Sequence, residues 1–171
     1  MKIYIVIPAH NEARFISQTL QSLADQSHKP DKLVIVDDGS TDNTSKIVEE
    51  FTSQYSFIEL VKNNTSQEHA PGSKVINAFY KGYYTLDEDY DVICKFDADL
   101  IFPKNYLERI SSYFENEPMA GMVGGFCSIQ RKNKWIPENL TGKDHIRGAL
   151  KAYSKNCFVQ IGKLKPAMGW D

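Results

Sequence analysis

The sequence of 171 residues is 42% hydrophobic and 25% charged, which is typical of one folded domain and argues against a disordered chain. The formal net charge of −2 argues against a general nucleic-acid-binding protein. The apolar runs are too short for a membrane span, and the opening run is too short for a signal-peptide core, so we expect a cytoplasmic protein.

The chain then alternates between strand-like apolar runs and helical periodicities. The sequence predicts strands over 2–7, ending before Pro8, and over 32–36, 57–61, 92–96 and 120–128. It predicts helices over 12–26 and from near Pro103. Two further helices are expected between these, one carrying Ile47, Val48 and Phe51 and capped by Thr41 or Asp42, and one carrying Val75, Ala78, Phe79 and Tyr83. The cysteines Cys94, Cys127 and Cys157 are far apart, and we expect buried free thiols.

This alternation predicts an α/β fold with a mostly parallel central sheet and helices on both faces, in a single domain over residues 1–171. Ligands of such sheets bind at the carboxyl ends of the strands, near the point where the strand order reverses. Polar segments follow three of the expected strands, at Pro8–Glu12, Asp37–Asp42 and Asp97–Asp99. We therefore expect three loops to converge at one edge of the sheet and to form a binding site there.

Asp97 and Asp99 are separated by one residue directly after an apolar strand. Carboxylates this close repel each other, and a divalent cation such as Mn²⁺ or Mg²⁺ would keep both ionised. These cations prefer oxygen ligands and complete their shell with water and substrate phosphates. An isolated D-x-D segment is more often a solvated loop or a helix cap, so the motif needs support from its surroundings.

The other two polar segments also have ordinary explanations. The Asp37–Ser40 segment consists of residues that are common in turns. Adjacent carboxylates at a strand end can nevertheless accept hydrogen bonds from a nucleobase and a ribose. Residues 8–12 could simply connect a strand to a helix, and His10 alone is more often a loop histidine than a ligand or a base. The ordered combination of the three segments is more informative than any one of them.

The chain resembles the family-2 glycosyltransferases in the residues and the order of three segments, which are P-A-H-N-E at 8–12, V-D-D-G-S-T-D at 36–42 and D-A-D at 97–99. The tail from Asp144 to Asp171 is similar to bacterial members of that family through its D-H-I-R-G-A, I-G and G-W-D segments. The resemblance covers nearly the whole chain. It implies a GT-A fold, which is a nucleotide-binding α/β sandwich.

The resemblance also implies roles for residues of the first two segments. The first loop of the family lies against the nucleobase, which points to Pro8, Ala9 and Glu12. The aspartate pair of the second segment points to Asp37 and Asp38 as nucleotide-sugar-binding residues, and the second aspartate contacts the base.

For the D-x-D segment, the resemblance implies that Asp97 approaches the ribose and that Asp99 binds the metal. Lys74 lies where relatives often carry a basic residue near the donor, so it is a candidate contact for the diphosphate. An exposed lysine at the start of a helix is an equally simple explanation for Lys74.

The activity implied by the resemblance is metal-assisted transfer of a sugar, with inversion, from a nucleoside-diphosphate sugar to an acceptor hydroxyl. The cation would offset charge on the diphosphate leaving group, and a carboxylate on the opposite side of the sugar would take the proton of the acceptor. Asp171 is the candidate for this catalytic base, and Trp170 is a candidate wall of the acceptor site, with a core aromatic as the alternative.

Features near the end of the chain concern the acceptor. Acidic positions that neighbour the G-W-D segment in relatives are absent, so we expect a chain truncated on its acceptor side. His145 and Arg147 could approach the donor phosphate or the acceptor, or form the polar start of a helix over 149–153. The acceptor could be a carbohydrate, a lipid-linked group or a protein, and the resemblance is compatible with peripheral association at the inner face of the membrane.

The same residues also bear on other classes of protein. A sugar nucleotidyltransferase would need a glycine-rich loop after its first strand, but residues 8–14 contain no glycine. A phosphatase of the haloacid-dehalogenase type would carry its D-x-D after the first strand instead of the fourth. A non-catalytic module that binds nucleotide sugars remains open as an alternative to the enzyme.

Overall fold

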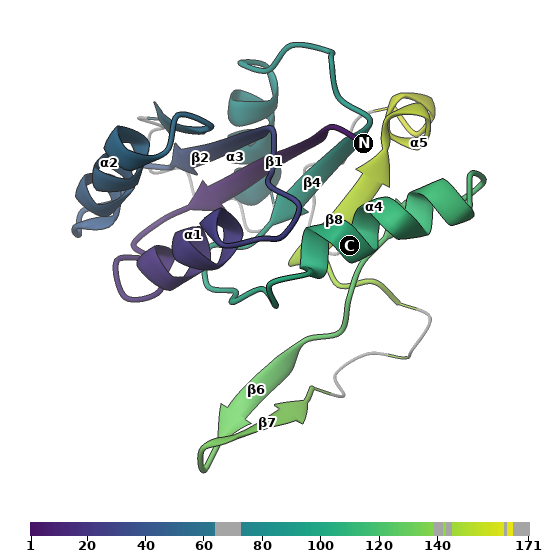
Figure 1. Cartoon of the computed structure of the whole chain (residues 1–171). Helices are drawn as coiled ribbons and strands as arrows, with labels where there is room; N and C mark the ends of the chain where they lie inside the picture. Colours follow the sequence, from purple (N-terminus) through teal and green to yellow (C-terminus); the bar gives the residue numbers. More distant parts are fainter. Residues whose placement is uncertain (64–72, 139–141, 143–144, 163, 166–171) are drawn as a thin grey trace.

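The computed structural model describes residues 1–63, 73–138, 142, 145–162 and 164–165 (Figure 1). Its elements are β1 (Ile3–Ala9), α1 (Ile16–Ala24), β2 (Lys32–Asp37), α2 (Thr44–Gln54), β3 (Ile58–Lys62), α3 (Ser73–Tyr83), β4 (Val92–Phe96), α4 (Tyr106–Asn116), β5 (Met122–Val123), β6 (Ser128–Arg131), β7 (Lys134–Pro137), β8 (Leu150–Ser154) and α5 (Lys155–Gln160). Within the described residues, no helix is long and apolar enough to cross a membrane.

The central sheet has the strand order β3-β2-β1-β4-β8-β5, and β6 and β7 form a separate two-stranded sheet. β1 is parallel to both β2 and β4, and β2 is parallel to β3. β8 runs antiparallel to β4 and β5. The expected α/β fold with a mostly parallel sheet is therefore confirmed.

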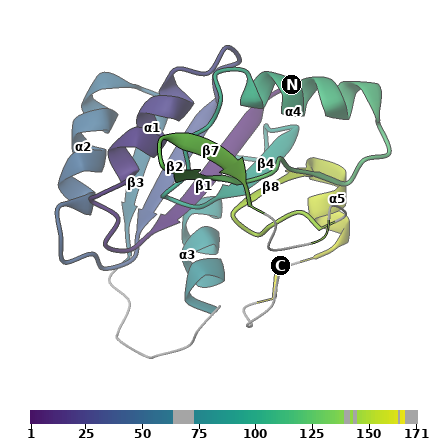
Figure 2. The same cartoon turned by 90° about the horizontal axis from the view of Figure 1, so that it is seen from below.

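Helices cover both faces of this sheet (Figure 2). The odd-numbered side chains of β1 pack with α1, α2 and α4, whereas Tyr4 and Val6 pack with α3 and α5. β1 is buried on both faces for this reason, and its sequence is continuously apolar instead of alternating. α3 approaches the sheet so closely that a Cβ atom at Gly82 would lie 2.6 Å from Val36 and 2.8 Å from Val6.

Two expected boundaries near the start of the chain were wrong. β1 does not end before Pro8 but continues through Ala9, with Pro8 paired to Val36. The pairing of β1 with β4 ends at Val6, so Pro8 lies where β1 pairs on one side, and its missing N–H group is tolerated there. The helix expected over 12–26 covers Ile16–Ala24, and Phe15 at its start is exposed.

The strand expected over 120–128 was also wrong. The chain forms a two-residue strand, β5, and then leaves the sheet at Gly124 and Gly125 before the β6–β7 hairpin begins. The glycines interrupt the apolar run because each is poorly suited to a strand interior.

The helix expected over 149–153 is a strand, β8. A five-residue segment with several apolar side chains fits either element, and here pairing with β4 decides it, with Ala152 opposite Cys94 and Tyr153 opposite Ile93. The three cysteines are free as expected, but only Cys94 is buried, whereas Cys127 and Cys157 are partly exposed.

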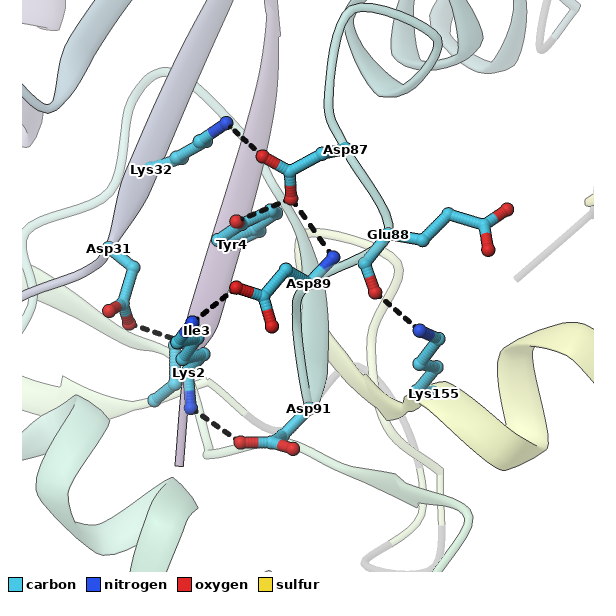
Figure 3. A network of polar contacts seen from close by, with 10 residues as sticks. All are labelled: Lys2, Ile3, Tyr4, Asp31, Lys32, Asp87, Glu88, Asp89, Asp91 and Lys155. Carbon is cyan, nitrogen blue, oxygen red and sulfur yellow. Dashed lines mark hydrogen bonds and ion pairs between the residues drawn. The ribbon is translucent and has the colours of Figure 1, made fainter.

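Polar contacts hold together the edge of the sheet at which the parallel strands β1, β2 and β4 begin, here called the amino edge (Figure 3). The Tyr4 hydroxyl donates to Oδ1 of Asp87 over 2.7 Å, and Lys32 Nζ lies 2.6 Å from Oδ2 of the same carboxylate. The backbone N–H of Ile3 donates to Asp31 over 2.8 Å. Burial raises the pKa of Tyr4 to about 12, and the Asp87 carboxylate adds to this shift. These contacts tie the loop before β4 to β1 and β2 at the edge opposite the polar segments singled out above.

Candidate functional site

The polar segments of the sequence follow β1, β2 and β4, which are neighbours in the sheet. Because these strands are parallel, the loops that follow them start at the same edge. β2 lies on one side of β1 and β4 on the other, so the strand order reverses at β1, where an α/β sheet opens a crevice for ligands. The expected convergence of the three loops is therefore present.

Hydrogen bonds join the first loop to the second. Asn11 adopts a left-handed backbone conformation with φ of 57°, and its Oδ1 accepts from the N–H of Thr41 over 2.8 Å. The N–H of Asn11 donates to Ser40 Oγ over 2.9 Å, and the N–H of Glu12 donates to Thr44 Oγ1 over 2.8 Å. The first loop is thus held by backbone and side-chain contacts to the second.

The adjacent aspartates at the end of β2 have different surroundings. Asp37 is buried, and its carboxylate accepts from the N–H of Ser40 over 2.9 Å and from the hydroxyl of Ser45. Asp38 is partly exposed, and its Oδ1 accepts from Nδ2 of the buried Asn63 over 2.7 Å. Asp37 therefore stabilises the turn, while Asp38 is presented at the edge with its orientation set by Asn63.

The D-x-D segment is fixed by contacts on both sides. Thr19 of α1, which is fully buried, donates from its hydroxyl to the carbonyl oxygen of Ala98 over 2.7 Å. The backbone N–H of Asp97 donates to the carbonyl oxygen of Ala149 over 2.9 Å. The carboxylate of Asp97 forms an ion pair with Lys95, whereas Asp99 is exposed. The two aspartates thus differ in charge environment: Asp97 has a neighbouring cation and Asp99 faces solvent.

Glu12 brings the first loop close to the D-x-D segment. Burial raises the pKa of the Glu12 carboxyl, and the negative charges of Asp99, Asp97 and Asp42 raise it further. Each of these contributions disfavours the ionised form of Glu12. The edge therefore gathers carboxylates from three loops and carries an unfavourable accumulation of negative charge.

This cluster fits a divalent cation that is shared with a ligand. Among the described residues, no three acidic, histidine or cysteine side chains are arranged as a complete protein cage for a metal. Mg²⁺ and Mn²⁺ in nucleotide sites typically use one or two carboxylates and take their other ligands from phosphates and water. The exposed carboxylate of Asp99, with the repulsion felt by Glu12, matches that type of site.

The remaining candidate residues are spread more widely. Pro8 and Ala9 form the end of β1, directly beside Val36 and Asp37. Lys74 is exposed in the first turn of α3, which packs on the face of the sheet opposite α1 and α2. No contact that the structure describes joins Lys74 to the acidic loops.

Several candidates at the end of the chain concern the acceptor side. Asp171 and Trp170 lie outside the described residues, as does Asp144. His145 is exposed, and Arg147 forms an ion pair with Glu138 at the base of the β6–β7 hairpin.

Two residues of this edge were missed by the sequence interpretation. Lys95 is a lysine within the apolar run of β4, and this anomaly was a visible signal, since a lysine is rarely buried without a partner. Asn63 follows β3, and nothing in its sequence context indicates that it reaches Asp38, because that contact depends on the pairing of β2 with β3.

Comparison with protein families gives a match to the model described as Glycosyl transferase family 2 over residues 4–165. The chain is 33% identical over 131 residues to the probable glycosyltransferase YdaM of Bacillus subtilis, covering 72% of the chain and 29% of that protein. It is 34% identical over 145 residues to a UDP-N-acetylglucosamine–dolichyl-phosphate N-acetylglucosaminyltransferase of Methanococcus voltae, covering 79% of the chain and 56% of that protein. The chain thus spans less than two thirds of these relatives.

Solved structures share the fold. A mannosyltransferase of Pyrobaculum calidifontis in complex with GDP-Man and Mn²⁺ superposes with a TM-score of 0.74 at 18% identity, covering 99% of this chain and 49% of that one. S. aureus TarS in complex with UDP-GlcNAc gives a TM-score of 0.69 at 19% identity, covering 94% of this chain and 47% of that one. These likenesses show a GT-A fold.

Proposed function

This chain belongs to glycosyl transferase family 2, and from that premise we propose that it transfers a sugar from a nucleoside-diphosphate sugar to an acceptor hydroxyl, with inversion and with help from a divalent cation. The observation that carries this proposal is that the loops after β1, β2 and β4 begin at the edge where the strand order reverses, with the first two loops joined by hydrogen bonds. That edge supplies oxygen acceptors for a nucleoside and carboxylates for a cation, which are the groups that such a donor requires.

The nucleoside would lie against the first two loops. Asp38 is oriented by Asn63 and would accept hydrogen bonds from the base, while Pro8, Ala9 and Glu12 would border it. Asp37 shapes the turn that presents Asp38, and its own contact with the donor stays a prediction. The structures of relatives in complex with GDP-Man and with UDP-GlcNAc make both guanosine and uridine donors worth testing.

The diphosphate would lie over the D-x-D segment. Asp99 would hold the cation, because Asp97 is already neutralised by Lys95 and can accept hydrogen bonds from the ribose hydroxyls. When bound, the cation offsets negative charge on the departing nucleoside diphosphate. Lys74 would contribute to the diphosphate site only if the donor reaches the start of α3.

The acceptor hydroxyl would enter from the side of the sugar opposite the diphosphate. Inversion requires a base on that side to take the proton of the attacking hydroxyl. Asp171 stays our prediction for this base. The relative from M. voltae is named for transfer to dolichyl phosphate, so lipid-linked acceptors are a first class to test.

The test is a donor screen with the chain itself. Calorimetric titrations with UDP-GlcNAc, GDP-Man and other nucleotide sugars, with Mn²⁺ or with a chelator, would measure donor affinity. Nucleoside-diphosphate release in the presence of candidate acceptors would measure transfer. We expect saturable binding of one donor that Mn²⁺ strengthens. Binding without turnover would identify a donor-binding module, and no binding of any donor would contradict the proposal.

A further inference from the structure

A two-stranded hairpin projects from the body of the protein (Figure 1). β6 pairs with β7 in antiparallel register, with Arg131 opposite Lys134. Lys132 and Asn133 connect the strands, and both have positive φ, of 46° and 61°. Positive φ at both central residues is the mark of a tight two-residue turn whose twist matches the strands. The hairpin is therefore a defined arm and not an irregular loop.

The tip of this hairpin carries a concentrated positive charge. Arg131, Lys132 and Lys134 are all exposed, and the sequence from 126 to 137 contains no acidic residue. The chain as a whole has a net charge of −2, so the hairpin differs in sign from the protein that carries it. Such a separation of charge points to an anionic partner at the tip.

Large apolar side chains accompany these cations. Trp135 follows Lys134 directly and is 59% exposed, Ile136 is 44% exposed, and Phe126 at the base of the hairpin is 78% exposed. Trp beside Lys or Arg is a combination typical of protein surfaces that bind at a membrane–water interface. The indole ring is stable in the headgroup region, and the cations are attracted to anionic lipids.

Contacts at the base of the hairpin connect it to the candidate site. The N–H of Glu138 donates to the carbonyl oxygen of Cys127 over 2.9 Å, and the Glu138 carboxylate forms an ion pair with Arg147. Two residues after Arg147, the carbonyl oxygen of Ala149 accepts from the N–H of Asp97. The base of the hairpin is therefore joined, through Arg147 and Ala149, to the loop that contains Asp97.

We propose that the β6–β7 hairpin docks the protein on a bilayer that contains anionic lipids, with Arg131, Lys132 and Lys134 against the headgroups and Trp135 in the interface. Nucleic acid fits less well, because Ile136 and Phe126 add aliphatic and apolar surface beside a net negative protein. The docking itself is independent of the donor. Docking would also bring the candidate site to a lipid-borne acceptor. This second step extends the proposed function and rests on it.

Vesicle binding tests the proposal directly. Flotation with phosphatidylcholine vesicles should leave the protein unbound, and vesicles containing phosphatidylglycerol should bind it at low salt. Each interfacial cation contributes roughly fivefold in partitioning, so replacing Arg131, Lys132 and Lys134 by Ser should weaken binding on the order of 100-fold. The matched control replaces the exposed Lys46, Lys81 and Lys104 by Ser, which changes the net charge equally and should leave most of the binding intact.

Fluorescence separates insertion of the indole from simple attraction. The protein has two tryptophans, Trp135 and Trp170, so a Trp170→Phe variant reports on Trp135 alone. We expect brominated lipids to quench Trp135 and its emission to shift to the blue on anionic vesicles. Trp135→Ser in the parent protein should weaken binding without changing its dependence on salt.

Three results would overturn the proposal: equal loss of binding in the hairpin triple variant and its control, binding of single-stranded RNA without binding of vesicles, and absence of quenching at saturating vesicle concentration. Thermal melting of every variant checks that it is folded. Because no donor is present, a failure of donor binding would leave these outcomes unaffected, and the two proposals can fail separately.

Discussion

The ammonium group of Lys95 forms an ion pair with the carboxylate of Asp97 at the carboxyl end of β4. The side chain of Lys95 is 2% exposed and that of Asp97 is 43% exposed, so a buried cation contacts a partly exposed carboxylate, the first of the D-x-D segment. The same ammonium group donates to the carbonyl oxygen of Gly148 over 3.2 Å. Lys95 thereby orients Asp97 and links β4 to the segment before β8.

Replacing Lys95 by Met tests whether this orientation matters for the donor. The variant removes the cation that orients Asp97 and offsets its charge, while the carboxylates of Asp99 and Glu12 stay nearby. The net negative charge of the site therefore increases, and this opposes binding of a diphosphate. We expect donor affinity to fall about tenfold, which corresponds to about 1.4 kcal/mol. Calorimetry with the preferred donor and Mn²⁺ would measure it.

The control for this variant is Lys81→Met, which removes an exposed lysine from α3. Its donor affinity should match that of the parent protein. A Lys95→Met variant that melts normally and binds donor as tightly as the parent would show that the ion pair serves only the fold.

Asp99→Asn tests the proposed cation ligand. The amide keeps the shape of the side chain but lacks the charge that favours Mn²⁺. We expect the affinity for UDP or GDP in Mn²⁺ to fall to the value measured with a chelator, and stability to change by less than about 0.5 kcal/mol because Asp99 is exposed. Glu117→Gln, an acid-to-amide change at another exposed position, is the control. Retention of the Mn²⁺ effect would remove Asp99 from the metal site.

Asp38→Ala tests the proposed contact with the nucleobase. A hydrogen bond to a charged group contributes about 1.5–3 kcal/mol, so we expect nucleotide affinity to fall by roughly 10-fold to 100-fold. The loss should persist with a chelator, because Asp38 acts without the cation. Calorimetry with free nucleotide would measure this, with Asp25→Ala at the C-terminal end of α1 as control. An unchanged affinity in a folded Asp38→Ala protein would contradict the assignment.

The sequence was sufficient to predict the sheet of β1, β2 and β4 because these strands are buried on both faces and are therefore largely apolar. It was not sufficient for β8, whose five residues fit a helix equally well. Only the pairing of β8 with β4, which joins residues far apart in the chain, distinguishes the two.

The position of the candidate site was predictable for a different reason. Parallel strands bring their carboxyl ends to one edge, so the polar segments after β1 and β2 had to meet there once the sheet formed. The partners of individual side chains were not predictable. Asn63 reaches Asp38 through the register of β2 and β3, and Lys95 reaches Asp97 because both side chains lie at the end of β4.

Asp87 gives the protein a predictable response to acid (Figure 3). Hydrogen bonds from Lys32 and then from Tyr4 hold the pKa of Asp87 below its ordinary value. Because the pKa of Asp87 is lower in the folded state than the unfolded-state value of about 3.9, the ionised carboxylate stabilises the fold at pH values above about 3.9. This stabilisation is lost as the pH falls from there toward the folded-state pKa. Asp87→Asn should therefore lower the free energy of unfolding at neutral pH, and the difference from the parent should shrink on acidification.

Urea denaturation of the parent and of Asp87→Asn, at neutral pH and at about pH 3, would measure this difference. The amide can still accept from Tyr4, so the variant removes the charge and keeps most of the shape. Asp25→Asn should show a smaller effect, because Asp25 accepts from the neutral amide of Gln21 within its own helix turn, whereas Asp87 is paired with the cation of Lys32. A difference between parent and Asp87→Asn that stays constant across this pH range would show that the carboxylate charge does not stabilise the amino edge of the sheet.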